Sequence, residues 1–259
     1  MPVDRPNVVL LHGALGFGDD WRAVEGALAP SCRVFVPDLL GGIAAPPVPD
    51  TARYGVAVEA ASMLERIAAR LVTRARVHLV GHDYGGVVAL EMARQRPGAV
   101  AGLVLYEPTR FDLLTDPFDR EFVQSVRRSV GMLVARGFGA GAARMFHDFW
   151  HGPGRFDALD EAARDRLARA APKLVLELQA MAEAPPGPSG DETRRIPATL
   201  VGGLRSFLIT RRVLERLAGS LRHASLEWID GDHHSPIEDP RPFVEVLRRA
   251  LPGLARAAA

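Results

Sequence analysis

The sequence predicts an α/β protein built on a doubly wound, mostly parallel sheet. Short apolar runs rich in valine and leucine, such as NVVLLHG at 7–13, are typical of strands that are buried on both faces. Helix-length patterns separate these runs along most of the chain, and this alternation indicates a parallel sheet with helices on both sides. In such a sheet the chemistry lies at the carboxyl ends of the strands, so we expect the functional residues there.

The elements expected up to residue 110 follow one another without a break. The strands are expected at 7–13, 32–38, 76–81 and 100–108. The helices between them are expected at 19–29, with Asp19 or Asp20 as the N-cap, at 56–72, and at 85–95, before Pro97. The chain therefore begins with four strands and three helices of the predicted sheet.

Residues 111–195 interrupt the alternation, because they carry helical patterns and no convincing strand. Helices are expected at 116–136 and 160–182, and the stretch EAPPGPSGDE at 183–192 has the proline and glycine content of a linker. The alternation then resumes with strands at 198–203 and 225–231, a helix at 210–220 and a closing helix from Pro240. We expect a core of about six strands formed by residues 1–110 and 196–259, with a helical cap and its return linker at 111–195.

Composition excludes several classes of partner. The 32 basic and 31 acidic residues leave a formal charge of +1, and no basic stripe with interleaved aromatics occurs, so no nucleic acid is expected. No run approaches the roughly 18 apolar residues of a membrane span, and the N-terminal residues do not resemble an export signal, so no membrane partner is expected. Cys32 is the only cysteine, which suits a reducing cytoplasm and excludes a cysteine metal cluster. We expect a cytoplasmic protein.

The stretch VGHDYGGVVAL at 80–90 has the form of a strand, a tight turn and a helix. In a turn of the type G-x-nucleophile-x-G, the central side chain is lifted into a pocket, and Gly81 and Gly85 permit the turn. The first N–H groups of the following helix stabilise a carboxylate and any developing oxyanion. Aspartate is also a common turn residue. The matching strand, helix and loops around Asp83 make it the candidate nucleophile.

These features resemble the α/β-hydrolase fold family over nearly the whole chain. LLHGALG at 10–16 resembles the oxyanion loop of the family, VPDLLGG at 36–42 its proline-aspartate-leucine loop, and DGDHHSPIEDP at 230–240 its histidine loop. Residues 111–195 correspond to its helical cap. The resemblance implies the family's mostly parallel sheet flanked by helices, and it implies the backbone N–H groups of Ala14 and Tyr84 as the oxyanion hole.

The resemblance also implies which histidine is the general base. The catalytic histidine of the family commonly precedes a proline by seven residues, with an acidic or polar residue two before that proline. His233 and Pro240 have this spacing, and Glu238 occupies the intermediate position. His233 is therefore the expected base, and His234 is the reserve candidate.

The acid that orients the histidine is expected in a less usual place. The family often places it in a G-x-x-D pattern after the strand that follows the cap, but Ser206 stands there, and no carboxylate occurs between Glu192 and Glu215. Some members carry the acid at the end of the strand after the nucleophile helix, where this chain has Glu107 in LVLYEP. Glu107 could instead be a surface residue at the end of its strand. The predicted triad is Asp83, His233 and Glu107.

Further candidates for contact with the substrate are histidines and one tryptophan: His12, His82, His147, Trp150 and His151. His12 has the alternative of holding its own loop together, and the three cap residues have the alternative of packing the cap. No H-E-x-x-H motif occurs, so we expect neither a metal ion nor a cofactor. A small, mostly apolar molecule in a cap-lined pocket is the expected substrate.

A carboxylate nucleophile favours attack on saturated carbon. Attack on an acyl group would give a reactive anhydride, whereas attack on an sp³ carbon gives an alkyl ester that water can hydrolyse. Epoxides and alkyl halides offer such a carbon with a leaving group. The resemblance therefore implies the aspartate-nucleophile branches of the family, which are the epoxide hydrolases and the haloalkane or haloacid dehalogenases.

The leaving-group residues of neither branch are complete. Epoxide hydrolases of this fold typically use cap tyrosines as acids, but the only tyrosines are Tyr54, Tyr84 and Tyr106, none of them in the cap. Haloalkane dehalogenases typically have tryptophan directly after the nucleophile, where Tyr84 stands. We favour an epoxide hydrolase with Tyr84 or a cap histidine as the acid, and a dehalogenase is the alternative.

Two alternatives from other classes stay open. Asp83 could act as a base in a non-hydrolytic isomerase, cyclase or lyase. The stretches LYEP and WHGPG also resemble a group of bacterial serine hydrolases, which is compatible with esterase ancestry and an altered nucleophile.

Overall fold

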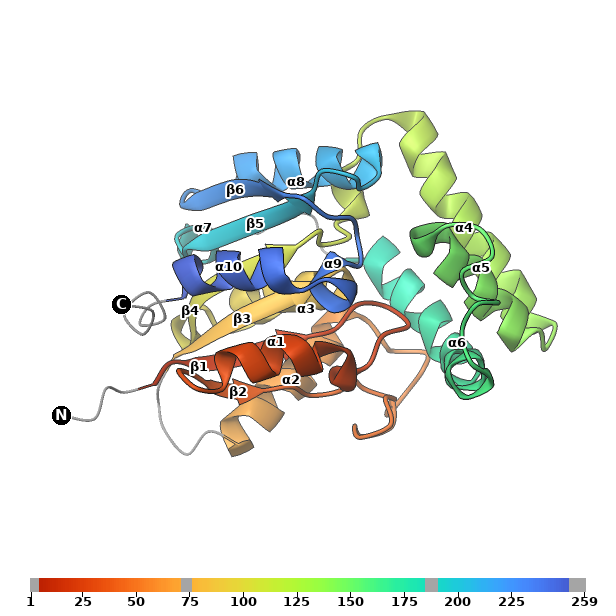
Figure 1. Cartoon of the computed structure of the whole chain (residues 1–259), viewed down its shortest axis with the longest axis horizontal. Helices are drawn as coiled ribbons and strands as arrows, with labels where there is room; N and C mark the ends of the chain where they lie inside the picture. Colours follow the sequence, from red (N-terminus) through yellow and green to blue (C-terminus); the bar gives the residue numbers. More distant parts are fainter. Residues whose placement is uncertain (1–4, 71–75, 185–190, 252–259) are drawn as a thin grey trace.

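The computed structural model describes residues 5–70, 76–184 and 191–251 (Figure 1). The end of the helix expected at 56–72 and most of the linker expected at 183–192 lie outside the described residues. The division of the chain into core and cap remains a prediction.

A six-stranded sheet forms the centre of the protein, and every neighbouring pair of strands is parallel. The order across the sheet is β2-β1-β3-β4-β5-β6. The strands are β1 (Asn7–Leu11), β2 (Arg33–Phe35), β3 (Val77–His82), β4 (Val100–Tyr106), β5 (Ala198–Gly203) and β6 (Ala224–Ile229). This sheet confirms the prediction of about six strands in a parallel α/β architecture.

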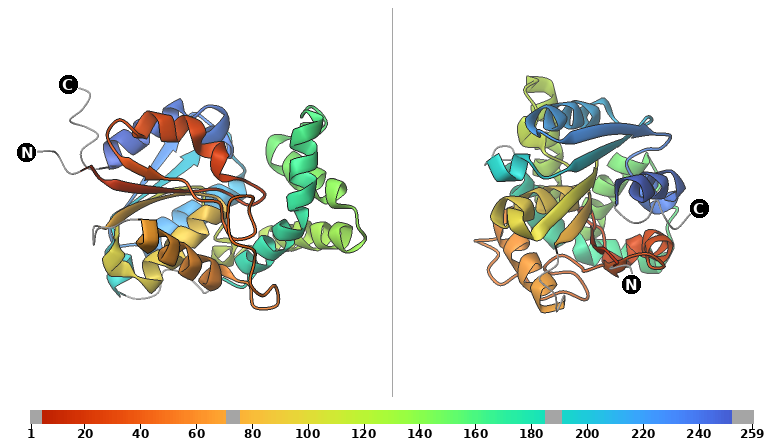
Figure 2. Two further views of the ribbon diagram at one scale, coloured as in Figure 1. Left: turned by 90° about the horizontal axis from the view of Figure 1, so that it is seen from below. Right: turned by 90° about the vertical axis from the view of Figure 1, so that its left-hand side faces the viewer.

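Helices cover both faces of the sheet, as Figure 2 shows in its left-hand view. On one face lie α1 (Arg22–Leu28) and α10 (Arg241–Ala250), and on the other lie α2 (Val56–Arg70), α3 (Tyr84–Gln95) and α8 (Leu208–Ser220). Strand residues alternate between the two faces: Val8 and Leu10 pack toward α1 and α10, and Val9 and Leu11 toward α2 and α3. The four inner strands, β1, β3, β4 and β5, are therefore buried on both sides, whereas the edge strands β2 and β6 are partly exposed.

Three long helices pack together beyond the carboxyl ends of the strands (Figure 1). They are α4 (Pro117–Ala135), α5 (Gly139–His151) and α6 (Glu161–Ala182). Asp116 caps α4 by accepting from the Phe118 N–H, and Asp160 caps α6 by accepting from the Ala163 N–H. These two helices agree with the expected ranges 116–136 and 160–182. A short helix, α7 (Asp191–Arg194), leads back to β5.

Two expected helix starts differ from the structure. Asp19 and Asp20 lie inside a 3₁₀ turn, Gly18–Trp21, and Trp21 is the N-cap of α1. Asp20 is engaged before the helix, because its Oδ2 accepts from the Phe17 N–H at 2.7 Å. Pro240 is the N-cap of α10, and a short helix, α9 (Ser235–Glu238), precedes it. No helix of the described residues combines the length and apolarity needed to cross a bilayer.

The register of β3 and β4 determines where the site forms. His82 of β3 lies opposite Tyr106 of β4, so the next residues, Asp83 and Glu107, leave the sheet side by side. The Asp83 N–H continues the pairing by donating to the Tyr106 carbonyl at 3.1 Å. Two residues 24 positions apart are thus neighbours because of strand pairing alone.

Candidate active site

Asp83 lies at a strained turn between β3 and α3. Its φ of 51° and ψ of −119° place a non-glycine residue in the left-handed region, which is rare and concentrates at functional sites. The glycines around it make the turn possible, since a Cβ on Gly81 would lie 2.6 Å from the Gly85 carbonyl oxygen and one on Gly85 would collide with the Leu11 carbonyl. The backbone therefore directs the Asp83 side chain away from the sheet.

The two carboxylate oxygens of Asp83 have different surroundings. Oδ2 accepts from the Ala14 N–H at 2.7 Å. Oδ1 is buried and accepts no hydrogen bond from the described residues, and the nearby Thr109 hydroxyl donates to Met181 Sδ. Burial raises the pKa of Asp83, whereas the charge on His233 and the N–H groups of Ala14 and Tyr84 act in the opposite direction. Oδ2 is thus held by the backbone, whereas Oδ1 has no hydrogen-bond partner among the described residues.

His233 and Glu107 form a buried pair beside Asp83. His233 Nδ1 donates to Glu107 Oε2 at 2.8 Å, and Glu107 Oε1 accepts from the Gly203 N–H at 2.7 Å. Glu107 also has a positive φ, 43°, at the end of β4. Both side chains are almost fully buried, so the carboxylate fixes the ring and leaves Nε2 as the nitrogen that can take a proton. The structure thus brings the three predicted triad residues into one place.

A cavity of about 230 Å³ is lined by Asp83 and His233. Its lining joins the oxyanion loop, the end of β3, the histidine loop, α5 and α6. Of the predicted site residues, those that line it are Ala14, His82, Asp83, His147, Trp150, His151 and His233. His12, Tyr84 and Glu107 are not among its lining residues, and Glu107 lies behind His233.

Trp150 covers the His233 ring. The two rings stack with centroids 3.6 Å apart and an interplanar angle of 15°. Trp150 Nε1 is buried and has no hydrogen-bond partner among the described residues. Helix α5 therefore places an apolar surface and an unused N–H donor directly at the predicted base.

A stack of three more histidines adjoins this pair. The His147 and His151 rings lie 3.9 Å apart, and the His151 and His234 rings 3.6 Å apart, each pair nearly parallel. Burial lowers the pKa of each of the three, and that of His82, so the rings are neutral at pH 7. His234, the reserve candidate for the base, is engaged in this stack.

The spacing of His147 and His151 is also one that two metal ligands on a helix can use. Their rings stack on each other instead. Within the ranges that the structure describes, no group of three or more histidine, cysteine, aspartate or glutamate residues could hold a metal ion.

The pKa values of the buried histidines predict an acid-sensitive fold. Between about pH 7 and pH 5 the unfolded chain takes up protons at His234, whose ordinary value is 6.5, and the folded chain does not. The free energy of unfolding should therefore fall as the pH falls. His234→Gln should reduce this slope by up to about 1.4 kcal/mol per pH unit, measured by urea unfolding. An unchanged slope in His234→Gln would contradict the prediction.

Two predicted site residues have other positions. His12 Nδ1 lies 2.8 Å from the Gly13 carbonyl, and its Nε2 accepts from the Leu39 N–H at 3.0 Å, so the ring joins the oxyanion loop to the 36–42 loop. Burial lowers the pKa of His12 to about 4, which keeps it neutral. The Tyr84 hydroxyl lies 3.1 Å from the Tyr54 hydroxyl, outside the cavity of Asp83. Tyr84 is thus not placed to protonate a leaving group.

Several cavity residues carried no signal in the sequence. Arg166 of α6 lies over the Phe17 ring at 3.6 Å and pairs with Asp19 at 2.7 Å. Leu159, Leu167 and Ile237 complete the apolar lining. Cap residues that line a pocket follow the same helical pattern as those that pack, so only the packing of the helices separates the two groups.

Comparison with known proteins gives the same architecture. The model of the alpha/beta hydrolase family matches residues 8–246. "Putative carbamate hydrolase RutD" of Stutzerimonas stutzeri is 27% identical over 95% of this chain and 92% of that protein. MenH from S. aureus has a TM-score of 0.77 at 15% identity, with 98% of this chain and 96% of that chain covered. The enol-lactonase from Burkholderia xenovorans LB400 has a TM-score of 0.73 at 17% identity, with 95% and 90% covered.

The two structural likenesses establish the fold alone, because their identities are low. The family match covers nearly the whole chain, including the oxyanion loop, the turn at Asp83 and the histidine loop. The parallel sheet and the turn geometry agree with it. The chain therefore belongs to the alpha/beta hydrolase family.

Proposed function

We propose that this hydrolase uses Asp83 as a nucleophile toward saturated carbon and opens epoxides through a covalent alkyl ester. The observation that carries the proposal is the position of Asp83 Oδ2, 2.7 Å from the Ala14 nitrogen. That N–H is one of the two donors implied for the oxyanion hole. The nucleophile itself therefore fills half of the hole in the resting enzyme.

A filled hole argues against an acyl substrate. Acyl transfer requires the substrate's carbonyl oxygen to accept from the hole donors as it becomes negative, and here that place holds a carboxylate oxygen. Attack on an alkyl carbon needs no such place in its first step. This reasoning separates the proposal from the carbamate hydrolysis that the name of the RutD relative states.

The same contact serves the second step. Oδ1 attacks the alkyl carbon and forms the C–O bond of an ester while the carbon–oxygen bond of the epoxide breaks. Oδ2 is then the ester carbonyl oxygen, already on Ala14 N–H. His233 takes a proton from water, whose oxygen adds to the Asp83 carboxyl carbon, and the resulting oxyanion is Oδ2. Collapse breaks the bond from Oδ1 to the Asp83 carboxyl carbon and releases the diol, whose leaving oxygen receives the proton from His233. Asp83 then carries the second water proton, and loss of that proton restores both the carboxylate and the acid that protonated the epoxide oxygen.

Donors for the leaving group come from the cap and the histidine loop. Trp150 Nε1 and His234 Nε2 are buried without a hydrogen-bond partner among the described residues. An epoxide oxygen needs a proton as well as a hydrogen bond, and the His147, His151 and His234 stack offers groups that can transfer one. These rings are neutral at pH 7, so one of them must first take up a proton, and its lowered pKa then makes that imidazolium a strong acid.

A haloalkane dehalogenase is the second candidate, and Trp150 is the observation that favours it. A halide needs an N–H donor and no proton, so the unpartnered indole Nε1 suffices. The two reactions differ in their products, since an epoxide gives a diol and an alkyl halide gives an alcohol and a halide ion. A panel of small apolar epoxides and chloroalkanes, assayed for diol and for chloride, distinguishes them.

The decisive experiment is a single turnover in ¹⁸O-labelled water, followed by mass analysis of the peptide that contains Asp83. The ester route puts one atom of water oxygen into the Asp83 carboxylate. A role for Asp83 as a base in an isomerase, cyclase or lyase leaves that carboxylate unlabelled. Product formation without label would therefore reject the nucleophile.

Glu107→Gln tests the partner of the proposed base. The amide loses the charge that stabilises protonated His233, and because only its oxygen accepts, it cannot accept from His233 and Gly203 through separate atoms as the carboxylate does. We expect kcat to fall about 10²- to 10⁴-fold, on the analogy of other triads, with KM little changed. Steady-state kinetics with a small aryl epoxide would measure this, with the exposed Glu245→Gln as the control. Near-normal kcat in Glu107→Gln would assign Glu107 a structural role only.

A further inference from the structure

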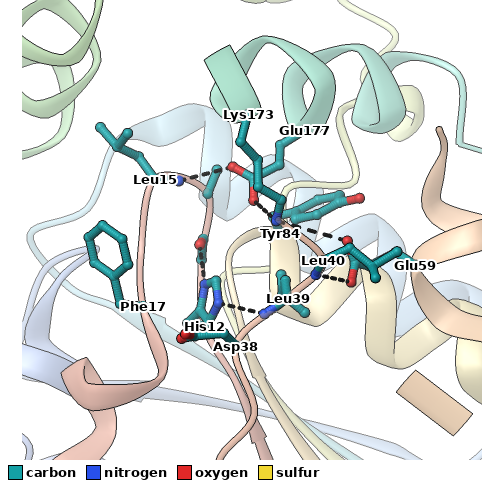
Figure 3. Close-up of polar contacts among 12 residues, drawn as sticks. His12, Leu15, Phe17, Asp38, Leu39, Leu40, Glu59, Tyr84, Lys173 and Glu177 are labelled. Atoms are coloured by element: carbon teal, nitrogen blue, oxygen red, sulfur yellow. Dashed lines mark hydrogen bonds and ion pairs between the residues drawn. The ribbon is translucent and has the colours of Figure 1, made fainter. Parts of the chain in front are cut away.

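A buried network of charged and phenolic side chains lies beside the oxyanion loop at Leu15 (Figure 3). Its members are Glu59 of α2, Tyr54 just before α2, Tyr84 of α3, and Lys173 and Glu177 of α6. None of these side chains has a role in the chemistry proposed above, and none lines the cavity that contains Asp83. Burying two carboxylates is costly unless each is satisfied, so their partners indicate what the network does.

Glu177 holds the oxyanion loop directly. Its Oε2 accepts from the Leu15 N–H at 3.1 Å, and the side chain is 2% exposed. Leu15 has a φ of 56°, which costs free energy in a non-glycine residue. Ala14, whose N–H reaches Asp83, is the preceding residue. A carboxylate from a helix of the predicted cap therefore stabilises the turn that presents the hole donor.

Lys173 joins the two buried carboxylates. Its Nζ lies 2.8 Å from Glu177 Oε1 and 3.9 Å from Glu59 Oε2, and it is the only lysine in the chain. Burial raises the pKa of Glu177, and the ammonium group of Lys173 acts against that rise. The Lys173 ammonium group thus favours the charged form of Glu177. In that form both carboxylate oxygens accept hydrogen bonds, one from the Leu15 N–H and one from Lys173.

Glu59 extends the network toward Tyr84, the residue that carries the second donor of the oxyanion hole. Its Oε2 accepts from the Tyr54 hydroxyl at 2.6 Å. Because the Tyr54 proton is used there, the Tyr84 hydroxyl is the donor in its 3.1 Å contact with Tyr54. Tyr84 is the first residue of α3, and its backbone N–H is the second implied donor. One network therefore contacts the residues on both sides of the oxyanion hole.

We propose that Glu177 is a positioning residue of the oxyanion hole. Through the network, the geometry of the hole depends on the position of helix α6 relative to the oxyanion loop. The proposal goes beyond the function proposed above, since a hole of this kind serves any hydrolysis at Asp83. It also gives α6 a role in catalysis that requires no contact with the substrate.

Three variants separate the role of the acceptor from that of the charge. Glu177→Gln keeps an oxygen for the Leu15 N–H and loses the charge, whereas Glu177→Ala loses both. The alanine variant leaves Lys173 and Glu59 as a one-to-one ion pair, so no uncompensated charge is buried. Glu183→Gln, at the exposed C-cap of the same helix, is the matched control; its side chain bonds only to Gln179 among the described contacts.

Two measurements need no substrate. Hydrogen exchange followed by NMR should show the Leu15 and Ala14 amides exchanging about five- to tenfold faster in Glu177→Ala, as expected for one lost hydrogen bond. Carboxyl ¹³C titration should show a higher pKa for Asp83 in the same variant, because a displaced Ala14 N–H no longer stabilises the carboxylate. Glu177→Gln should restore both values most of the way, and Glu183→Gln should equal the wild type.

Kinetics with styrene oxide provides the catalytic measurement. In Glu177→Ala we expect kcat to fall about ten- to a hundredfold with KM unchanged, which is less than the loss of a hole donor itself. Unchanged exchange at Leu15 and Ala14 in a folded Glu177→Ala protein would overturn the proposal, and so would faster exchange with an unchanged Asp83 pKa. Suppose that amide exchange and the Asp83 pKa change as expected but no alkyl ester on Asp83 forms in any variant. The positioning role of Glu177 would then be supported, and the alkyl-ester mechanism would be rejected.

Discussion

Asp83→Asn is expected to lower turnover by about 10⁵-fold or more, on the scale seen when a triad enzyme loses its nucleophile. The amide oxygen can still accept from Ala14 N–H, but the nitrogen that takes the place of Oδ1 cannot attack carbon. The stability of the fold should not decrease. Burial raises the pKa of Asp83, so the folded state disfavours its charge, and a neutral isostere should unfold at the same or a higher temperature. Steady-state rates and thermal unfolding would measure both effects.

Asp83→Ser sharpens this test. The shorter side chain removes Oδ2 from its place on Ala14 N–H and leaves the hole open to a substrate carbonyl oxygen. We expect this variant to lose epoxide opening and to gain hydrolysis of p-nitrophenyl acetate, with Asp83→Ala as the control that has neither activity. If Asp83→Asn retained more than about a tenth of the wild-type rate, Asp83 would be rejected as the nucleophile, because the loss of a nucleophile lowers the rate far more than tenfold.

His233→Gln is expected to stop the reaction after its first step. The glutamine amide can donate to Glu107 Oε2, so the buried carboxylate keeps a partner, but no group remains to take a proton from water. Alkylation of Asp83 should proceed, and the ester should accumulate. Intact-protein mass spectrometry should show one added substrate mass per chain, and multiple-turnover rates should fall about 10⁴-fold or more.

The neighbouring histidine is the control for this trap. His234→Gln changes the same loop and leaves the pair of His233 and Glu107 in place, so it should not accumulate ester. Trapping in His234→Gln but not in His233→Gln would transfer the role of base to His234. An absence of ester in both variants, with the substrate consumed by the wild type, would contradict the covalent route.

Much of the fold could be predicted, because its signals are local. Strands buried on both faces have unbroken apolar runs, and Asp116 and Asp160 mark the starts of α4 and α6 with N-cap side chains. The sequence carries no capping signal for the start of helix α5, since Phe138 stands at its N-cap and makes no side-chain hydrogen bond there. It also does not distinguish the 3₁₀ turn before α1 from a helix start, because Asp20 is a typical N-cap residue but accepts from the Phe17 N–H outside the helix.

The site likewise has a part that the sequence predicts and a part that it does not. Asp83, Glu107 and His233 follow strand ends within short motifs, so sequence alone places them at one edge of the sheet. The position of His12 depends on the backbone groups that occupy both its ring nitrogens, and no motif reports these. Glu59 lies on α2, and Lys173 and Glu177 lie 114 and 118 positions further along the chain on α6. Only the packing of α6 against the loops brings the three together.

The left-handed turn at residue 83 also bears on how such enzymes diverge. The backbone and the glycines around residue 83 set the direction of the side chain, so any small side chain at this position points in the same direction. If Asp83 attacks alkyl carbon as proposed, a change at this one position would change the type of carbon attacked. The backbone turn that directs the side chain would remain the same.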